Sequence, residues 1–548
     1  MQSTKKENIF LKIDFYVYIF FITYFILGIS IYNDYGISFD ENINRTNGFV
    51  SLSYVINFFN LNFDLSPFYK SIPHITEYGD REYGVVFDLP AAAIEVMLGI
   101  KNTKDIYLLR HLMTFLVFFL STVCFYILCF SIFKDKLVSF IGLIILIFSP
   151  RIFAESFYNP KDIIFLSFLI FSIHFNVKFL IYNSNTNIFF AALFSALMTD
   201  VRVIGIFLIF ITLFFLFFHS GKLNVKEKFL IFFKYLLIYV VTLFVFWPFL
   251  WESSFSNLLN AINEFKNYPW NGDIFYFGEY INAKFVPWHY FIVWFFITTP
   301  LAFSLVILCG FLFTGKIFIN NLIYIEKNKN TNLWNNQYEM ILIYIFLIFF
   351  IPIFSVIIFD STLYSGWRQL YFLYPPLIIL SLHFLIYIKK NFINFFKIIL
   401  ILLILQLSLI SFFLVKNHPH QHVYFNGLSN LFIKNKFAYD YWGVSNHLTI
   451  KYLLDKKNFQ FPLKISTASF TDLNKTKLIL EEEYKDKFEF IEDNHSDADF
   501  IFTNYYYFKN PKFNKKRYNI PKNFSSYYQF KIGEKTVNEL YINNLKHN

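Results

Sequence analysis

The sequence predicts a polytopic α-helical membrane protein with about 11 transmembrane helices and a small C-terminal α/β domain. Hydrophobic residues make up 56% of the 548 residues and charged residues 16%, whereas soluble chains average about 25% charged residues. Apolar runs near the length that crosses a bilayer recur up to residue 415. From Lys416 onward the charge density rises, which indicates a second, water-soluble domain.

The apolar runs give the predicted spans. They lie near 11–32, 112–133, 137–149, 163–183, 188–199, 203–218, 229–250, 291–314, 338–359, 370–388 and 392–414. The first run follows Lys5 and Lys6, is too long for a signal-peptide core, and has no small-residue cleavage site after it. We therefore expect it to remain as the first helix.

Basic residues predict the orientation of the spans. Short connections carry the groups Lys5/Lys6, Lys134/Lys136, Lys222/Lys226/Lys228, Lys316/Lys327/Lys329 and Lys389/Lys390. All of them fall on one side of the membrane, which the positive-inside rule makes the cytoplasmic side. The N-terminus is then cytoplasmic. The exterior of the inner (cell) membrane receives loops 33–111, 150–162, 200–202, 251–290 and 360–369, together with residues 416–548.

Residues 416–548 have the composition of a soluble domain, with 20 Lys and Arg and 14 Asp and Glu. Leu463–Thr467, Phe488–Ile491 and Asp499–Asn504 have strand patterns, and Asp472–Lys485 has a helical one, which predicts an α/β module. Its net positive charge suits contact with an anionic membrane surface and equally a simple soluble basic domain.

Several functional classes lack their sequence signals. The cysteines Cys124, Cys129 and Cys309 all lie in apolar runs, which favours neither a disulfide framework nor a zinc site. No Gly-rich phosphate loop or nucleic-acid-binding motif is present. We expect no required cofactor and no nucleic-acid partner, and leave dependence on a divalent metal open.

The segment Tyr35–Arg45 (YGISFDENINR) places Asp40 and Glu41 where the first span leaves the membrane. A carboxylate held near an acceptor hydroxyl acts as a general base; metal ligation and hydrogen bonding to the loop backbone are the alternatives. The long first exterior loop 33–111 also contains the charged and aromatic stretch Ile72–Asp88, with Glu82, and the apolar segment Ala91–Ile100, which is suited to the membrane interface.

Two further exterior segments carry cations and carboxylates. In Ser149–Asp162 (SPRIFAESFYNPKD), two prolines interrupt the flanking helices. Arg or Lys here suits a phosphate and Asp162 suits a hydroxyl, although a helix–helix turn explains the same charges. In Ser361–Pro376 (STLYSGWRQLYFLYPP), Arg368 suits a lipid phosphate or interfacial anchoring. The candidate substrate-binding residues of the exterior loops are Glu82, Arg151, Asn159, Lys161, Asp162 and Arg368.

The DE pair, the ESFYNPKD loop, the GWRQLYFLYPP segment and the soluble tail together resemble membrane glycosyltransferases of the GT-C type. The likeness is greatest to bacterial family 39, the relatives of protein O-mannosyltransferases and of the aminoarabinose transferase of lipid A. Tail segments Asn417–Leu428, Tyr439–Asn446 and Ala498–Tyr506 resemble bacterial members as well. The resemblance extends over nearly the whole chain.

The resemblance implies an inverting transfer of a sugar from a polyprenyl-phosphate carrier to a lipid, protein or polysaccharide acceptor on the exterior face. Asp40 matches the catalytic base of the family and Glu41 its companion, and Asp162 falls where the family has a second acidic residue. Related members often carry Asp where Ser365 stands before GWR, so donor or acceptor contacts differ there. Some GT-C enzymes use a divalent metal.

Loop 251–290 combines aromatic and polar residues that suit sugar recognition. They are Trp270, Asn271, Asp273, Tyr276, Glu279, Lys284, Trp288 and His289. We expect this loop and the tail to cover the exterior cavity and to select the acceptor; aromatic anchoring at the membrane surface is the alternative. Two other functions stay open for the chain, a flippase for lipid-linked sugars and a non-catalytic assembly protein. The clustering of charge at one face favours an enzyme over a transporter.

Overall fold

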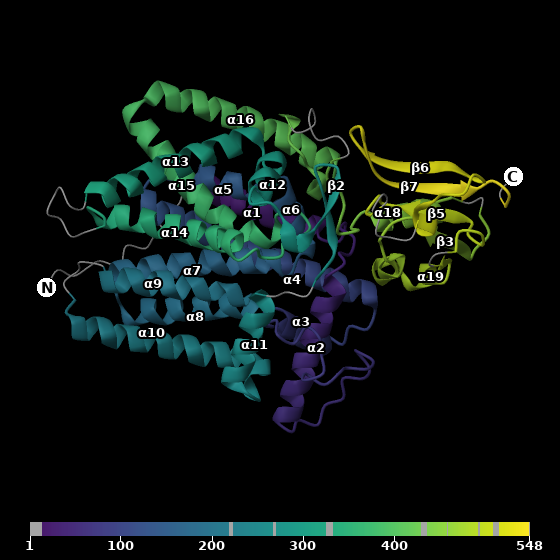
Figure 1. The fold of residues 1–548 in the computed structure, drawn as a ribbon, viewed down its shortest axis with the longest axis horizontal. Coiled ribbons are helices and arrows are strands. Elements are labelled where there is room, and N and C mark those ends of the chain that lie inside the picture. Colours follow the sequence, from purple (N-terminus) through teal and green to yellow (C-terminus); the bar gives the residue numbers. More distant parts are fainter. Residues whose placement is uncertain are drawn as a thin grey trace.

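The computed structural model describes residues 14–218, 223–266, 270–324, 333–428, 436–456, 459–491, 494–507 and 515–546. These residues form a helix bundle with a small sheet domain at one end (Figure 1). The bundle contains α1 (Phe15–Ile31), α4 (Thr103–Phe133), α5 (Lys136–Ile147), α6 (Pro150–Tyr158), α7 (Asp162–Tyr182), α8 (Asn185–Val201), α9 (Phe207–Phe218), α10 (Val225–Phe246), α12 (Tyr290–Thr298), α13 (Leu301–Tyr324), α14 (Gln337–Ile358), α15 (Tyr374–Asn391) and α16 (Ile393–Lys416).

The bundle has the character of a multi-pass membrane protein. Among the described residues, seven helices are long and apolar enough to cross a membrane, or eight if α5 and α6 form one bent span. The predicted span 291–314 divides into α12 and α13, and α8, at the predicted span 188–199, is not among these seven helices. The helix α1 and the segment Val203–Phe218 are shorter apolar helices. The segment 150–162, predicted to be a loop, contains the helix α6. The basic residues Lys5, Lys6, Lys222, Lys327 and Lys329, used for the predicted orientation, lie outside the described residues.

Two proline positions shape the end of the bundle that carries the site. The axes of α5 and α6 differ by 64° across Ser149–Pro150, where proline begins the second helix. The residue before a proline is driven out of the helical region, which explains why α5 ends there. Thr299, before Pro300, is likewise extended and separates α12 from α13. The first break turns the charged side chains of α6 inward, into the protein.

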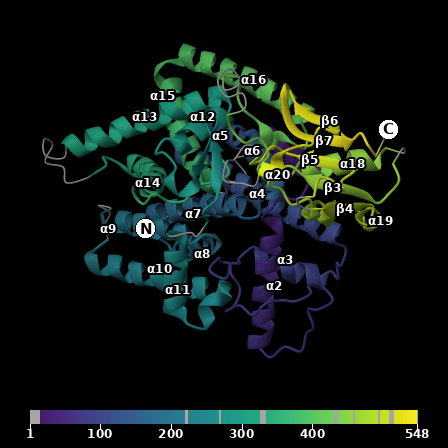
Figure 2. The ribbon, with the colours of Figure 1, turned by 45° about the vertical axis from the view of Figure 1, so that its right-hand side comes forward.

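The segment 33–111 contains helices rather than irregular chain alone. It forms α2 (Glu41–Phe58) and α3 (Asp88–Met97), and α4 already begins at Thr103. Figures 1 and 2 show α2 running across the ends of the bundle helices, on the side that carries the sheet domain. The segment 251–290 forms α11 (Ser254–Lys266) and an antiparallel hairpin of β1 (Asp273–Tyr276) and β2 (Glu279–Asn282).

The C-terminal domain is a five-stranded sheet of order β4-β3-β5-β7-β6 with short helices. Its elements are α18 (Asn446–Leu454), β3 (Leu463–Thr467), α19 (Glu482–Lys485), β4 (Phe488–Ile491), β5 (Phe500–Thr503), α20 (Lys515–Tyr518), β6 (Phe524–Ile532) and β7 (Lys535–Asn543). The strands β3, β4 and β5 pair in parallel, and β5, β7 and β6 pair antiparallel. The three predicted strands are therefore confirmed. The predicted helix 472–485 is wrong as one element, because it divides into the 3-10 helix Leu473–Ile479 and α19.

Candidate functional site

Asp40 lies at the bundle end that faces the C-terminal domain, in a segment that contacts Trp442, Lys475 and Arg368. It is the residue before α2, and its side chain makes no capping hydrogen bond to that helix. The preceding residue, Phe39, donates its N–H to the carbonyl of Trp442 at 3.2 Å, and its own carbonyl accepts from Lys475 Nζ at 2.9 Å. The Asp40 side chain is 36% exposed, so its carboxylate is both positioned and accessible.

Arg368 connects Asp40 to the interior of the site. Its Nη2 lies 3.1 Å from Asp40 Oδ2, and its Nη1 donates to Asp162 Oδ2 at 2.8 Å. Asp162 also pairs with Arg202. Two arginines and two carboxylates thus alternate in one chain of contacts, and this balances charges that would otherwise be costly to bury. The guanidinium of Arg368 also lies 4.3 Å from the ring centre of Trp442, a cation–π contact.

The α6–α7 turn fixes the orientation of Asp162. Asn159 donates from Nδ2 to Glu155 Oε2 at 2.8 Å and to Asp162 Oδ2 at 3.0 Å, and its Oδ1 accepts from the backbone N–H of Asp162 at 2.9 Å. Glu155 accepts a hydrogen bond from Tyr371 at 2.7 Å. All three of these polar residues of the turn are buried and hydrogen-bonded, which suits them to fix the shape of the turn. The substrate contacts expected of Asn159 and Asp162 stay predictions.

Arg151 has a different environment from Arg368. Its guanidinium is buried between the rings of Trp294 and Phe425, at 5.4 and 5.0 Å, and its Nε donates to the carbonyl of Tyr424 at 3.4 Å. Nη2 of Arg151 has no hydrogen-bond partner among the described residues. A buried cation whose donors are not all satisfied is suited to an anion.

Further buried donors near Arg151 and Arg368 also lack a hydrogen-bond partner. In the described part of the chain, hydrogen-bond partners are missing for Arg368 Nε, Trp294 Nε1, Trp442 Nε1, Tyr158 OH and Tyr441 OH. The ring of Trp442 lies 5.9 Å from that of Tyr441 and 6.4 Å from that of Tyr158. Each unsatisfied buried donor costs about 1–3 kcal/mol. The cluster therefore indicates a place for a ligand rich in hydrogen-bond acceptors.

Tyr441 lies within this cluster. Burial raises the pKa of its hydroxyl above the usual range, and the charges of Glu155, Arg151 and Arg368 also act on it. Gly366 lies next to Tyr441 and Arg151: a Cβ there would be in ordinary contact with Tyr441 OH at 3.6 Å and with Arg151 Nη1 at 3.7 Å, but the φ of Gly366 is +72°. An L-residue is strained at this φ.

Lys161 and Glu82 lie beside this site, around the loop that precedes α3. Lys161 Nζ lies 3.9 Å from the ring centre of Tyr83, and burial lowers the pKa of Lys161 to about 8. Glu82 pairs with its neighbour Arg81 at 3.0 Å and borders a cavity of about 20 Å³ beside Arg202. Burial raises the pKa of Asp80, which also feels the charges of Lys161, Asp40 and Glu82. The predicted residues Lys161, Asp40 and Glu82 thus all lie near Asp80. No contact between Glu82 and Asp40 is found among the described residues.

Glu41 has a place quite unlike that of Asp40. It is buried, its Oε1 accepts from the N–H of Ser38 at 2.6 Å, and its Oε2 is 2.8 Å from His111 Nε2. Both oxygens are therefore occupied by the loop and by α4. These contacts suit Glu41 to hold the Asp40 segment in place, and its expected role as companion of Asp40 stays a prediction.

The C-terminal domain contributes residues next to Asp40. Burial lowers the pKa of Lys475, and Asp40 is the nearest charge acting against that shift. Burial raises the pKa of Tyr506 to about 12, and the charges of Arg368 and Asp40 also act on it. Sequence reasoning missed Lys475, Tyr506 and Tyr441 as site residues. The YDYWGVSN stretch was a signal for the last of these, since two aromatics follow Asp440 directly.

Metal ligands do not gather at this site in the part of the chain that the structure describes, where no three His, Cys, Asp or Glu side chains are grouped to hold a metal ion. The arrangement instead offers one accessible carboxylate, an ion-paired arginine and a buried arginine among unsatisfied donors. Comparison with protein-family models and with curated proteins finds no match to this chain.

Proposed function

We propose that the protein is a GT-C-like membrane glycosyltransferase of about 11 spans that moves a sugar from a polyprenyl-phosphate carrier to an exterior acceptor. One observation carries this proposal: the accessible carboxylate of Asp40 lies beside a buried cluster of unsatisfied N–H and O–H donors around Arg151. A transfer from a lipid phosphate needs these two functions, a base for the acceptor and donors for the leaving group.

In the proposed reaction, the acceptor hydroxyl oxygen attacks C1 of the sugar on the side opposite the phosphate. Its proton passes to the Asp40 carboxylate, the C1–O bond to the phosphate breaks, and the bonding pair leaves with the lipid phosphate. The configuration at C1 inverts. Arg368 Nη2 lies 3.1 Å from Asp40 Oδ2 and holds this carboxylate in place.

The donor phosphate is assigned to Arg151 and the donors near it. Arg368 already pairs with Asp40 and Asp162, so most of its charge is compensated, whereas Arg151 is held by two aromatic rings and a carbonyl. A phosphate oxygen accepts charge-assisted hydrogen bonds from such a guanidinium. The sequence prediction adds Lys161, whose Nζ lies 3.9 Å from the ring centre of Tyr83, as a second source of positive charge for the donor. The carrier lipid would lie along the apolar surface of the bundle.

A comparison of a deletion strain with its parent tests the proposal. We expect one sugar to be lost from an exterior lipid, protein or polysaccharide, and wild-type protein to restore it. The variant Asp40→Asn should not restore it. Asp34→Asn is the matched control, because Asp34 is an exposed carboxylate of the same loop that pairs with His418; this variant should restore the sugar fully.

The rival functions give other results in the same strains. An unchanged exterior glycan with a lipid-linked sugar redistributed across the membrane would identify a flippase. Restoration by Asp40→Asn as well as by wild type would remove Asp40 from the chemistry and would favour the non-catalytic assembly protein. Either result overturns the proposed transfer.

A further inference from the structure

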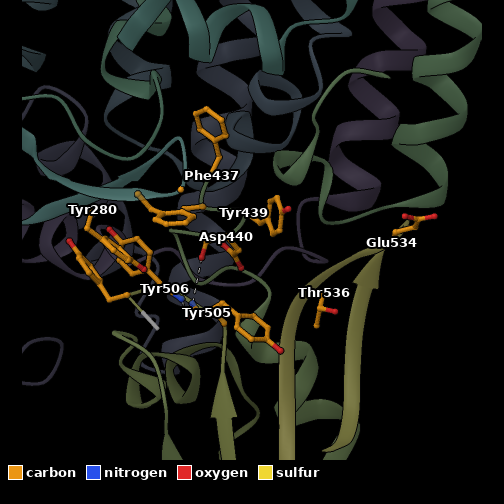
Figure 3. Close-up of a pocket in the computed structure, with 13 residues that line it drawn as sticks. Tyr280, Phe437, Tyr439, Asp440, Tyr505, Tyr506, Glu534 and Thr536 are labelled. Carbon is orange, nitrogen blue, oxygen red and sulfur yellow. Dashed lines mark hydrogen bonds between the residues drawn. The ribbon is translucent and has the colours of Figure 1, made fainter. Parts of the chain in front are cut away.

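A cavity of about 640 Å³ lies between the β1–β2 hairpin and the C-terminal domain. Its walls come from that hairpin, residues 437–440, residues 504–507 after β5, and the start of β7. Figure 3 shows Tyr280 and Tyr506 together on one side, with Glu534 and Thr536 at the β6–β7 turn on the other. Small-molecule sites have volumes of about 300–1,000 Å³, so this cavity has the size of a ligand site.

Tyrosine dominates the lining. Five of the lining residues are Tyr280, Tyr439, Tyr505, Tyr506 and Tyr507. The rings of Tyr280 and Tyr507 stack at 5.6 Å with an interplanar angle of 13°, and this joins the hairpin to the C-terminal domain. A tyrosine offers an apolar ring face and a polar hydroxyl. A sugar presents the matching pair of surfaces, C–H groups on the faces of its ring and hydroxyls around the edge.

The remaining polar lining disfavours an anionic ligand. Glu534 supplies a carboxylate, and among the described lining residues there is no Lys, Arg or His. Asp440 also lines the cavity, but its side chain is fully buried and its carboxylate accepts hydrogen bonds from the N–H and hydroxyl of Ser445. Asn504 and Thr536 add neutral hydrogen-bonding groups. An uncharged polyhydroxyl ligand fits this lining better than a phosphate or an acidic sugar.

The cavity adjoins the Asp40 site. Tyr439 and Asp440 of its wall directly precede Tyr441 and Trp442. The carbonyl of Trp442 accepts a hydrogen bond at 3.2 Å from Phe39, the residue before Asp40. Tyr506 also lines the cavity and feels the charges of Asp40 and Arg368. A ligand held in the cavity therefore lies next to the segment that carries Asp40.

We propose that this cavity binds a neutral oligosaccharide and presents one of its hydroxyls to Asp40, so that the acceptor of the reaction is an uncharged glycan. The acceptor role rests on the proposed function, whereas binding of the glycan does not. The proposal is thus tested by binding rather than by turnover.

The test uses full-length protein in detergent, carrying Asp40→Asn so that no transfer occurs, on an array of neutral oligosaccharides with sulfated and sialylated ones for comparison. We expect binding to a subset of the neutral oligosaccharides only. Tyr439→Ala should weaken this binding about tenfold, the scale of one lost aromatic contact. The matched control is Tyr484→Ala in α19, a tyrosine of the same domain outside the cavity lining, which should bind as before.

A second variant fills the cavity without removing a wall. Thr536 lies on β7, where a tyrosine is well tolerated as a strand residue, so Thr536→Tyr should abolish binding while the protein stays folded. Binding of no neutral oligosaccharide, preference for anionic ones, or binding unchanged in Thr536→Tyr overturns the proposal. If neutral glycans bind as expected but wild-type protein transfers no sugar, the proposed function fails and the cavity assignment stands.

Discussion

Replacing Asp40 by Asn is expected to remove catalysis while leaving the fold almost unchanged. The Asp40 side chain is 36% exposed, and its pair with Arg368 is therefore partly screened by solvent. Such exposed pairs contribute about 0–1 kcal/mol, so the loss of stability should stay below about 1 kcal/mol. Loss of a general base lowers turnover by about 10²- to 10⁴-fold.

Asp162→Asn is the matched control, since Asp162 contacts the same arginine. Its side chain is 1% exposed and pairs with both Arg368 and Arg202. Removing this charge leaves two buried arginines undercompensated, for which about 3–5 kcal/mol of destabilisation is typical. The two variants therefore separate catalysis from stability at one ion-pair chain.

Two measurements on purified protein check this comparison. The thermal unfolding midpoint in detergent should move by less than about 2 °C for Asp40→Asn and by several times more for Asp162→Asn. Transfer from a polyprenyl-phosphate sugar is measured per amount of folded protein. A folded Asp40→Asn protein whose turnover stays within about threefold of wild type would remove Asp40 from the chemistry.

Three further outcomes are expected. Arg151→Gln should raise the KM for the lipid-linked donor about 10- to 100-fold, with a much smaller effect on the acceptor KM in initial-rate assays. Burial lowers the pKa of Lys161 to about 8, so Lys161 loses its positive charge as the pH rises from 7 to 9. The donor KM should therefore rise over this pH range. Lys161→Arg keeps the charge and should flatten that pH profile. Reporter fusions after Lys228 and Lys390 should be cytoplasmic and those after Leu414 exterior, and the reverse pattern would contradict the predicted exterior site.

The membrane helices were predictable because their signal is local. Runs of apolar residues gave the positions of most bundle helices, and parallel strands such as Phe488–Ile491 appeared as short hydrophobic runs. The helix α6 was missed because it carries charged residues, and the break between α12 and α13 was missed inside one apolar run. The hairpin β6–β7 was not predicted, because its strands mix Ser, Tyr, Gln, Lys and Asn and lack a clear alternation. Likewise α2 begins ENINRTNG, a stretch too polar to give a span signal.

The site was predictable in part. Asp40, Arg368 and Asp162 were found separately, but their contacts join segments more than 100 residues apart, which a local pattern does not contain. Glu41 shows that sequence neighbours can have different surroundings. It is adjacent to Asp40 in sequence, yet it begins a helix and turns inward to His111, so its exposure differs completely. Neighbours in a motif share a role only when the backbone points them in one direction.

The contact between Phe39 and Lys475 has a consequence for how the protein is made. The Asp40 segment is synthesised well before Lys475, which follows Phe39 by 436 residues. At about 5–20 residues per second, roughly a minute separates them. During that interval the Asp40 segment lacks the hydrogen bond that Lys475 donates to Phe39. A chain that stops before Lys475 therefore never gains this contact between the bundle end and the C-terminal domain.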